Sequence, residues 1–181
     1  MQCPDCGIDL TAVAYRGVLI HECGGCRGRW FEREELRKAK DRTDDDLRWL
    51  DFYPFEATNK LAVPSQGKHC PRCAIEMSSL TYDKSRVVVD RCTKCVGVWL
   101  DHGEFEKIIR YLEHIVLTES AAGYARDAVK QFAQIATGPK GPVAEARDFF
   151  AVLKLLEFRI AVEHPKLADA AQTIYKASPF K

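Results

Sequence analysis

Apolar and polar residues alternate in two pairs of short segments in the first half of the chain. The first pair covers residues 11–15 and 18–21, and the second covers residues 79–82 and 87–90. Alternation over four or five residues, with turn residues in between, is typical of β-hairpins. The pattern therefore predicts two short hairpins, well separated along the chain.

The second half of the chain shows instead the 3.6-residue period of amphipathic helices. A helix is predicted over residues 103–117, and another over residues 119–135. Four residues of the latter are expected to face inward: Tyr124, Ala128, Phe132 and Ile135. A break at residues 137–142, which read TGPKGP, precedes a longer helix over residues 143–163. A last short helix is expected over residues 166–176.

The helix over residues 143–163 has apolar residues on more than one narrow stripe. They include Phe149, Phe150, Val152, Leu153, Leu156 and Ile160. Such a helix needs burial on more than one side. We expect it to pack on its neighbours, on the N-terminal half or on a second copy of the chain, and we predict dimerisation through it.

The segment between the two hairpins contains a cluster of aromatic residues. It consists of Trp49, Phe52, Tyr53 and Phe55. A short helix through Leu47 and Leu50 is expected there, and Pro54 would end it. We expect the aromatic cluster to pack between the two halves; a partner-binding patch is the alternative.

The two predicted hairpins belong to a longer internal repeat. Residues 3–38 align with residues 70–107 when a gap of two residues follows Gly17. Aligned pairs include Pro4 with Pro71, Ile8 with Ile75, Tyr15 with Tyr82, Val18 with Val87, Gly28 with Gly97, Trp30 with Trp99 and Glu35 with Glu104. This agreement indicates a duplicated module. Because Trp30 and Trp99 hold the same place, we expect both to have a structural role and to cap the small core beside the cysteines; stacking on a ligand is the alternative.

All eight cysteines fall into four Cys-x-x-Cys pairs, two in each copy of the repeat. A tight turn of this kind brings two thiolates to one metal ion, and two such pairs make a tetrahedral zinc site. The repeat favours one ion per copy. We expect one Zn²⁺ at Cys3, Cys6, Cys23 and Cys26, and one at Cys70, Cys73, Cys92 and Cys95. Metal-free buried cysteines, or His69 as a substitute ligand, are the alternatives.

Charge and composition bear on the compartment and on the partners. Hydrophobic residues make up 46% of the chain and charged residues 29%, as in ordinary globular proteins. No basic and apolar leader precedes Cys3 and no apolar run could span a membrane, so we expect a cytoplasmic protein with reduced cysteines.

The net charge depends on the metal. Eight thiolates add eight negative charges and two zinc ions add four positive ones, which takes the formal net charge from +1 to −3. Such a balance does not favour non-specific nucleic-acid binding.

At these residues the sequence resembles the TFIIB-type (transcription factor) zinc-finger family of small zinc-ribbon proteins. Residues 92–105, CTKCVGVWLDHGEF, are close to the family pattern of Cys-x-x-Cys-x-Gly-x-Trp, an acidic residue and a helix start. Residues 23–36, CGGCRGRWFEREEL, depart from it where Arg33 and Glu34 replace a residue-plus-glycine step. We expect that departure to affect the helix start more than the metal site. The resemblance covers residues 1–40 and 68–110 and implies zinc binding by both copies.

The expected fold class is small α+β, with two tandem four-cysteine zinc ribbons built on short β-hairpins, followed by a helical C-terminal region. The first ribbon is expected over residues 1–40 and a linker with a short helix over residues 41–69. The second ribbon and its trailing helix are expected over residues 70–117, and the helical region over residues 118–181.

The zinc sites do not predict an enzyme. Four thiolates per ion leave no open coordination position, and the five histidines show no HExxH spacing. The first hypothesis is a structural zinc-binding protein that acts as a protein-interaction or regulatory module, through a protein partner or self-association. A thiol redox sensor that releases zinc is one alternative.

A zinc-ribbon nucleic-acid binder in transcription is the other alternative. Its contacts would come from a basic stretch with interleaved aromatic residues, at Arg27, Arg29, Arg33 and Arg37. Acidic residues alternate with these arginines, which favours a solvated surface of mixed charge.

Overall fold

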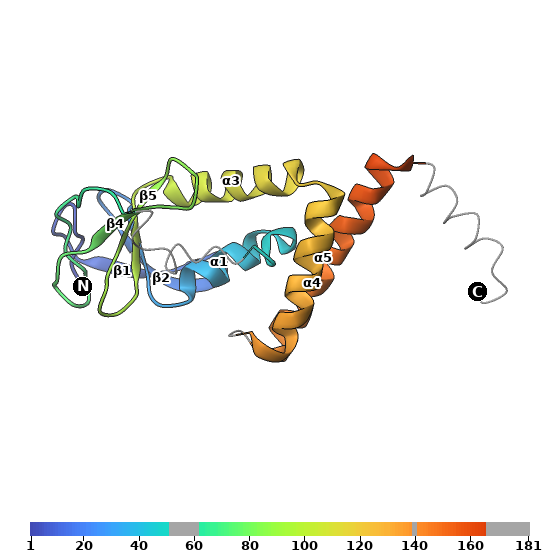
Figure 1. Cartoon of the computed structure of the whole chain (residues 1–181). Coiled ribbons are helices and arrows are strands. Elements are labelled where there is room, and N and C mark those ends of the chain that lie inside the picture. The colour runs from blue at the N-terminus through green and yellow to red at the C-terminus, as the bar shows by residue number, and fades with distance from the viewer. Residues whose placement is uncertain (51–61, 139–140, 166–181) are drawn as a thin grey trace. The chain divides into compact units, whose positions relative to one another are not determined.

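The structure is a computed structural model that describes residues 1–50, 62–138 and 141–165. The chain divides into two compact units, Met1–His114 and Ile115–Lys181. The elements follow one another along the chain as Figure 1 shows.

A six-stranded sheet forms the centre of the first unit. Its order is β1-β2-β3-β6-β5-β4, and every pairing is antiparallel. The strands are β1 (Leu10–Tyr15), β2 (Val18–Cys23), β3 (Arg29–Phe31), β4 (Ser78–Thr81), β5 (Val88–Arg91) and β6 (Val98–Leu100). Each repeat contributes three strands, and both predicted hairpins are present as β1–β2 and β4–β5.

The two repeats meet in the middle of this sheet. Strands β3 and β6 pair in a register that sets Trp30 opposite Trp99. The two halves are therefore related by an approximate two-fold axis that passes near this pair of tryptophans. Two separate hairpins predicted from the sequence thus become one continuous sheet.

A helix follows the last strand of each repeat: α1 (Glu35–Thr43) in the first and α3 (Glu104–Thr118) in the second. In the second repeat the backbone N–H of Asp101 donates to Glu104 Oε2 at 2.8 Å, which is one of the two hydrogen bonds of a capping box. Its counterpart in the first repeat runs from the N–H of Glu32 to Glu35 Oε2 at 2.7 Å. Both helix starts therefore share one design.

The residue before each of these helices has a left-handed backbone. Gly103 has φ 81° and Glu34 has φ 70°. Glycine adopts this conformation without strain, whereas a side chain there costs energy. The departure from the family pattern at Glu34 thus lies at the helix start, as expected, and leaves the metal site unchanged.

A buried lysine, Lys40, stabilises the segment that follows α1. Lys40 Nζ donates to the backbone carbonyls of Leu47 at 2.7 Å and Leu50 at 2.9 Å. The expected short helix is a 3₁₀ turn, η1 (Asp45–Leu47), and Trp49 is buried beside it. The other members of the predicted aromatic cluster, Phe52, Tyr53 and Phe55, lie outside the described residues, as does Pro54.

Helix α3 packs through the face that its period predicts. Phe105, Ile108, Ile109 and Leu112 are buried. The ring of Phe105 stacks on that of Phe31, with centroids 5.9 Å apart.

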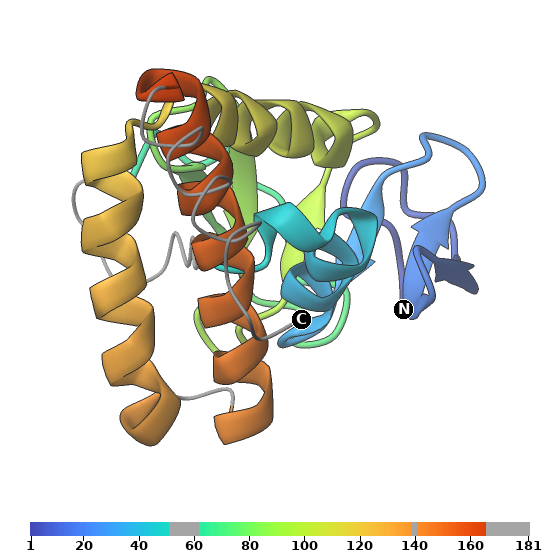
Figure 2. The same cartoon turned by 90° about the vertical axis from the view of Figure 1, so that its right-hand side faces the viewer.

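The second unit contains a helical hairpin. Helices α4 (Ala121–Thr137) and α5 (Pro142–Glu163) lie side by side in both views (Figures 1 and 2). They are antiparallel, since the N–H of Ala121 at the start of α4 donates to Glu163 at the end of α5. The predicted helix over residues 166–176 lies outside the described residues.

One expectation for α4 is wrong. Tyr124 and Ala128 are buried as predicted, but Phe132 is 64% exposed. Gln131 takes the buried position instead. The helical period places both residues near the edge of the inner face. Because neighbouring residues point in different directions around a helix, only one of the two is buried. In the part of the chain that the structure describes, no helix is long and apolar enough to cross a membrane.

Candidate metal centres

Each Cys-x-x-Cys pair folds into a closed turn. The backbone N–H of the residue after the second cysteine donates to the carbonyl of the first, at 2.9 to 3.0 Å in all four turns. That residue has a positive φ in every case: Gly7 (70°), Arg27 (59°), Ala74 (55°) and Val96 (65°). Such a turn directs both cysteine side chains to one side, and it does so even where the residue is not glycine.

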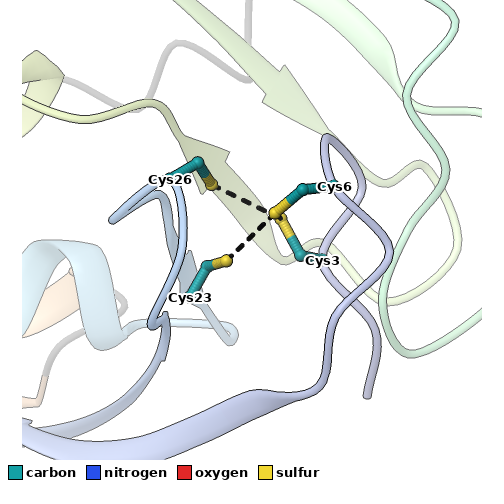
Figure 3. A group of neighbouring side chains, drawn as sticks. All are labelled: Cys3, Cys6, Cys23 and Cys26. Carbon is teal, nitrogen blue, oxygen red and sulfur yellow. Dashed lines mark hydrogen bonds between the residues drawn. The ribbon is translucent and has the colours of Figure 1, made fainter.

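The turns of one repeat bring four sulfur atoms together. Cys3 and Cys6 come from the turn before β1, and Cys23 and Cys26 from the turn between β2 and β3, and they point toward one another (Figure 3). Sγ–Sγ distances include 3.4 Å from Cys3 to Cys6 and 3.3 Å from Cys6 to Cys23. All four sulfur atoms lie within 4.8 Å of one another.

The second repeat reproduces the cluster. Cys70, Cys73, Cys92 and Cys95 also lie within 4.8 Å of one another, with 3.6 Å between the sulfurs of Cys70 and Cys95. In both clusters the first cysteine of each turn is buried. The sulfur atoms therefore face the protein interior, and the second cysteines close the site toward its surface.

These distances fit a tetrahedral zinc ion. A Zn–S bond of about 2.3 Å places the sulfurs of a regular tetrahedron about 3.8 Å apart. Disulfide sulfurs would lie at about 2.05 Å, and none of the eight cysteines, all within the described residues, is bonded in this way. Four thiolates without oxygen ligands suit zinc rather than calcium or magnesium. Each cluster therefore holds one Zn²⁺, with the ligand sets that the repeat predicts.

Residues 2–42 and 69–111 both match the model of the transcription factor zinc-finger family. Each matched segment is one copy of the internal repeat with its four-cysteine cluster. No curated protein and no solved structure matches the chain. The two matched segments are called the first and the second ribbon below.

Backbone N–H groups support the thiolate forms within each ribbon. Burial alone would raise the pKa of Cys23 and Cys92, but hydrogen bonds from backbone N–H groups, chiefly those of Cys26 and Cys95, lower each pKa to about 7. Burial raises the pKa of Cys3 and Cys70. The two ribbons thus have matching electrostatics as well as matching geometry, and binding of Zn²⁺ deprotonates all four thiols of a site.

The repeated Gly-x-Trp step has a role that the sequence did not reveal. A Cβ atom built on Gly28 would lie 2.2 Å from Cζ2 of Trp99, and one built on Gly97 would lie 2.2 Å from Cζ2 of Trp30. Each indole therefore lies directly against the glycine of the other ribbon. Both tryptophans lie in the core beside the cysteines, as expected. The pairing of β3 with β6 adds that each ring contacts the glycine of the other ribbon.

Both metal centres consequently share one hydrophobic core. It contains Cys3, Cys23, Cys70 and Cys92 together with Trp30, Trp99 and Met77. A single small ribbon buries too little apolar surface to be stable without its metal. In this chain the two ribbons bury each other's tryptophans, so each metal site is supported by both. The repeated Gly-x-Trp was the signal that could have indicated this pairing.

A buried cation lies beside the first metal centre. Lys68 Nζ is 3.2 Å from Asp5, 3.2 Å from Asp90 and 2.5 Å from Asp101. Burial by itself would lower the pKa of Lys68, but the three carboxylates outweigh it and raise that pKa above its usual value. Asp5 lies within the first Cys-x-x-Cys turn, so the network links that turn to the second ribbon.

The four arginines proposed for nucleic-acid contacts do not form a common free surface. Arg29 pairs with Glu22 at 2.8 Å and with Glu106 at 3.1 Å, and its guanidinium lies 4.0 Å from the ring centroid of Tyr15. Arg37 pairs with Glu34 and Asp41. Arg27 and Arg33 are exposed. Two of the four are thus engaged in ion pairs within the first unit, and the nucleic-acid hypothesis stays a prediction.

Proposed function

We propose that this protein is a protein-interaction module, in which two structural Zn²⁺ ions stabilise the ribbons and the α4–α5 hairpin associates with a second copy of the chain. Support for a structural role of zinc comes from the ligand sets. Four thiolates close each coordination sphere, and a catalytic zinc needs an open position for water or substrate. We therefore propose that the protein is not an enzyme.

The exposed apolar surface of the hairpin carries the interaction proposal. Large hydrophobic side chains that face solvent on these two helices are Val129, Phe132, Val143, Phe150, Phe158, Ile160 and Val162. Phe150 is 65% exposed and Phe158 is 68% exposed. Isolated exposed hydrophobic residues are ordinary, but seven on one pair of helices are typical of an interaction surface.

A second copy of the chain is a suitable occupant for physical reasons. Two helices that pack on each other make a single layer, and a stable helical domain needs a second layer. Two such hairpins can complete a four-helix bundle, in which the same surface of each copy buries the other. The apolar residues of α5 would then be covered on more than one side, as their pattern requires.

The test is the mass of the full, zinc-loaded chain by size-exclusion chromatography with light scattering, at concentrations from 1 to 100 μM, about the range in which modest interfaces associate. We expect a dimer in the wild type and a monomer in Phe150→Glu/Phe158→Glu. Leu19→Glu is the matched control, because Leu19 is 63% exposed on β2 of the first ribbon. A monomeric wild type at every concentration would exclude self-association.

A further inference from the structure

The approximate two-fold symmetry of the first unit creates two equivalent corners, one around each tryptophan. At the corner of Trp99, the indole Nε1–H donates to Asp5 Oδ2 at 3.0 Å and to Asp101 Oδ1 at 2.9 Å. Asp90, the strand partner of Trp99, accepts from Ser79 Oγ at 2.5 Å. Lys68 contacts all three carboxylates, so every polar group of this corner has a partner.

Backbone hydrogen bonds establish which residues correspond at the other corner. The N–H of Met77 donates to the carbonyl of Lys68 at 2.9 Å, and the N–H of Leu10 donates to that of Met1 at 2.8 Å. The repeats are therefore in register before the first cysteine as well as after it. At the corner of Trp30, this register puts Arg72 in the place of Asp5, Glu32 in that of Asp101, and His21 in that of Asp90.

The corner of Trp30 is polar but incompletely paired. Trp30 is fully buried, and among the described residues its indole Nε1 has no hydrogen-bond partner. His21, which pairs with Trp30 across β2 and β3, has a buried Nδ1 that also lacks a partner within the described ranges. Glu32 does not accept from the indole; it pairs instead with Arg72 at 3.2 Å. Buried N–H groups are nearly always hydrogen-bonded, so the indole N–H of Trp30 calls for an acceptor beyond the described residues.

The charges of the two corners indicate the chemistry of that acceptor. The corner of Trp99 has three carboxylates around one cation, whereas the corner of Trp30 has one carboxylate and one cation. At the corner of Trp99, the carboxylate of Asp5 accepts the hydrogen bond of the indole N–H. At the corner of Trp30, Arg72 occupies the position equivalent to Asp5. Guanidinium groups bind carboxylates through two parallel hydrogen bonds.

We propose that the corner of Trp30 binds an external carboxylate, an aspartate or glutamate side chain of a protein partner. The carboxylate accepts the indole N–H of Trp30 and pairs with Arg72, and it thereby takes the role that Asp5 has at the other corner. The side chain of Arg72 is 56% exposed and that of Glu32 is 35% exposed. A surface ion pair of this kind exchanges partners readily, so the incoming carboxylate displaces Glu32 from Arg72.

This site lies in the first unit and does not depend on self-association through α4 and α5. A monomeric protein could have it, and a dimeric protein could lack it. The two proposals therefore fail independently.

The test follows the indole ¹H–¹⁵N resonances of the zinc-loaded full chain during titration with sodium acetate at constant ionic strength. Trp30→Phe assigns the resonance of Trp30, because it removes that signal alone. We expect the Trp30 signal to shift saturably with acetate. The signal of Trp99, whose N–H already has two carboxylate acceptors, is the internal control and should not move.

Two variants separate an external from an internal acceptor. Arg72→Asp reproduces the arrangement at Asp5, so we expect the Trp30 signal to shift without acetate and to respond no further. Arg72→Gln keeps the hydrogen-bonding capacity but loses the charge, and we expect it to weaken acetate binding by about tenfold.

Three results would overturn the proposal. The first is a Trp30 resonance that acetate does not move. The second is a Glu32→Gln variant whose Trp30 resonance shifts without acetate, because Glu32 would then be the acceptor in solution. The third is binding of inorganic phosphate at least tenfold tighter than acetate, which would make this a phosphate site rather than a carboxylate site.

Discussion

Contact between Gly97 and Trp30 offers the sharpest test of the shared core. In Gly97→Ala the new Cβ would lie 2.2 Å from Cζ2 and 2.6 Å from Cη2 of the indole, whereas ordinary contact begins near 3.4 Å. The ring or the strand must therefore move by about 1.2 Å. Trp30 is fully buried and cannot turn into solvent. Overpacking of this kind costs about 1–3 kcal/mol, and we expect the upper end of that range.

A double-mutant cycle isolates this contact. Trp30→Phe removes Cζ2 and Cη2 and breaks no hydrogen bond, since the indole Nε1 has none to the described residues. It should cost about 2 kcal/mol for the cavity that it leaves. In the Trp30→Phe background, Gly97→Ala should cost at least about 1.5 kcal/mol less than in the wild type. The smaller ring leaves room for the methyl group.

The assay is urea unfolding with free Zn²⁺ buffered at one value for all variants, because bound metal contributes to the free energy of unfolding. Gly24→Ala is the matched control, since Gly24 lies in the second Cys-x-x-Cys turn of the first ribbon with nothing within 4 Å of a Cβ there. It should be neutral within about 0.5 kcal/mol. Additive effects of Gly97→Ala and Trp30→Phe would refute the contact between the ribbons.

Four further predictions concern the turns, the buried charges and the metal. Gly7→Ala should destabilise the protein by about 1 kcal/mol, whereas Ala74→Gly at the equivalent turn should stabilise it by up to about 1 kcal/mol, because both positions have a positive φ; thermal unfolding compares the two. Lys68→Met leaves three carboxylates without their cation and should cost about 2–3 kcal/mol in chemical unfolding; a loss below about 0.5 kcal/mol would contradict the network. Cys92→Ser should weaken zinc at both sites, and a chelator competition that finds the first site unchanged would argue against a common core. Burial raises the pKa of Glu104 to about 7, so its contribution to stability is complete below its unfolded pKa and is lost as the pH rises through 7. Glu104→Gln should lack that loss, and the difference in unfolding free energy from wild type between pH 6 and 8 measures it.

Local patterns in the sequence were sufficient for the elements and the metal ligands. Alternation located both hairpins, and the repeat of Cys-x-x-Cys divided eight cysteines into the two clusters that the structure contains. Both signals lie within a few residues of the structure that they specify. The helical period likewise located α3, α4 and α5 within a few residues.

Those local patterns do not predict which segments pair when they lie far apart in the sequence. Strands β3 and β6 are three residues each, too short to show alternation, and their pairing joins residues far apart in the chain. Nothing local marks Lys68 as the centre of a charge network, since its three partners come from different segments. The positive φ of Ala74 opposes its intrinsic preference and follows from the demand that two sulfurs face one ion.

The pairing of Trp30 with Trp99 joins two repeats that can carry different residues at equivalent positions of the sheet. An assembly of two identical single-ribbon chains would have the same residue at both symmetry-related places, so an aspartate at one would mean an aspartate at the other. A covalent tandem removes that constraint. Here one place holds Asp5 and the other holds Arg72, so a symmetric frame presents two chemically opposite faces.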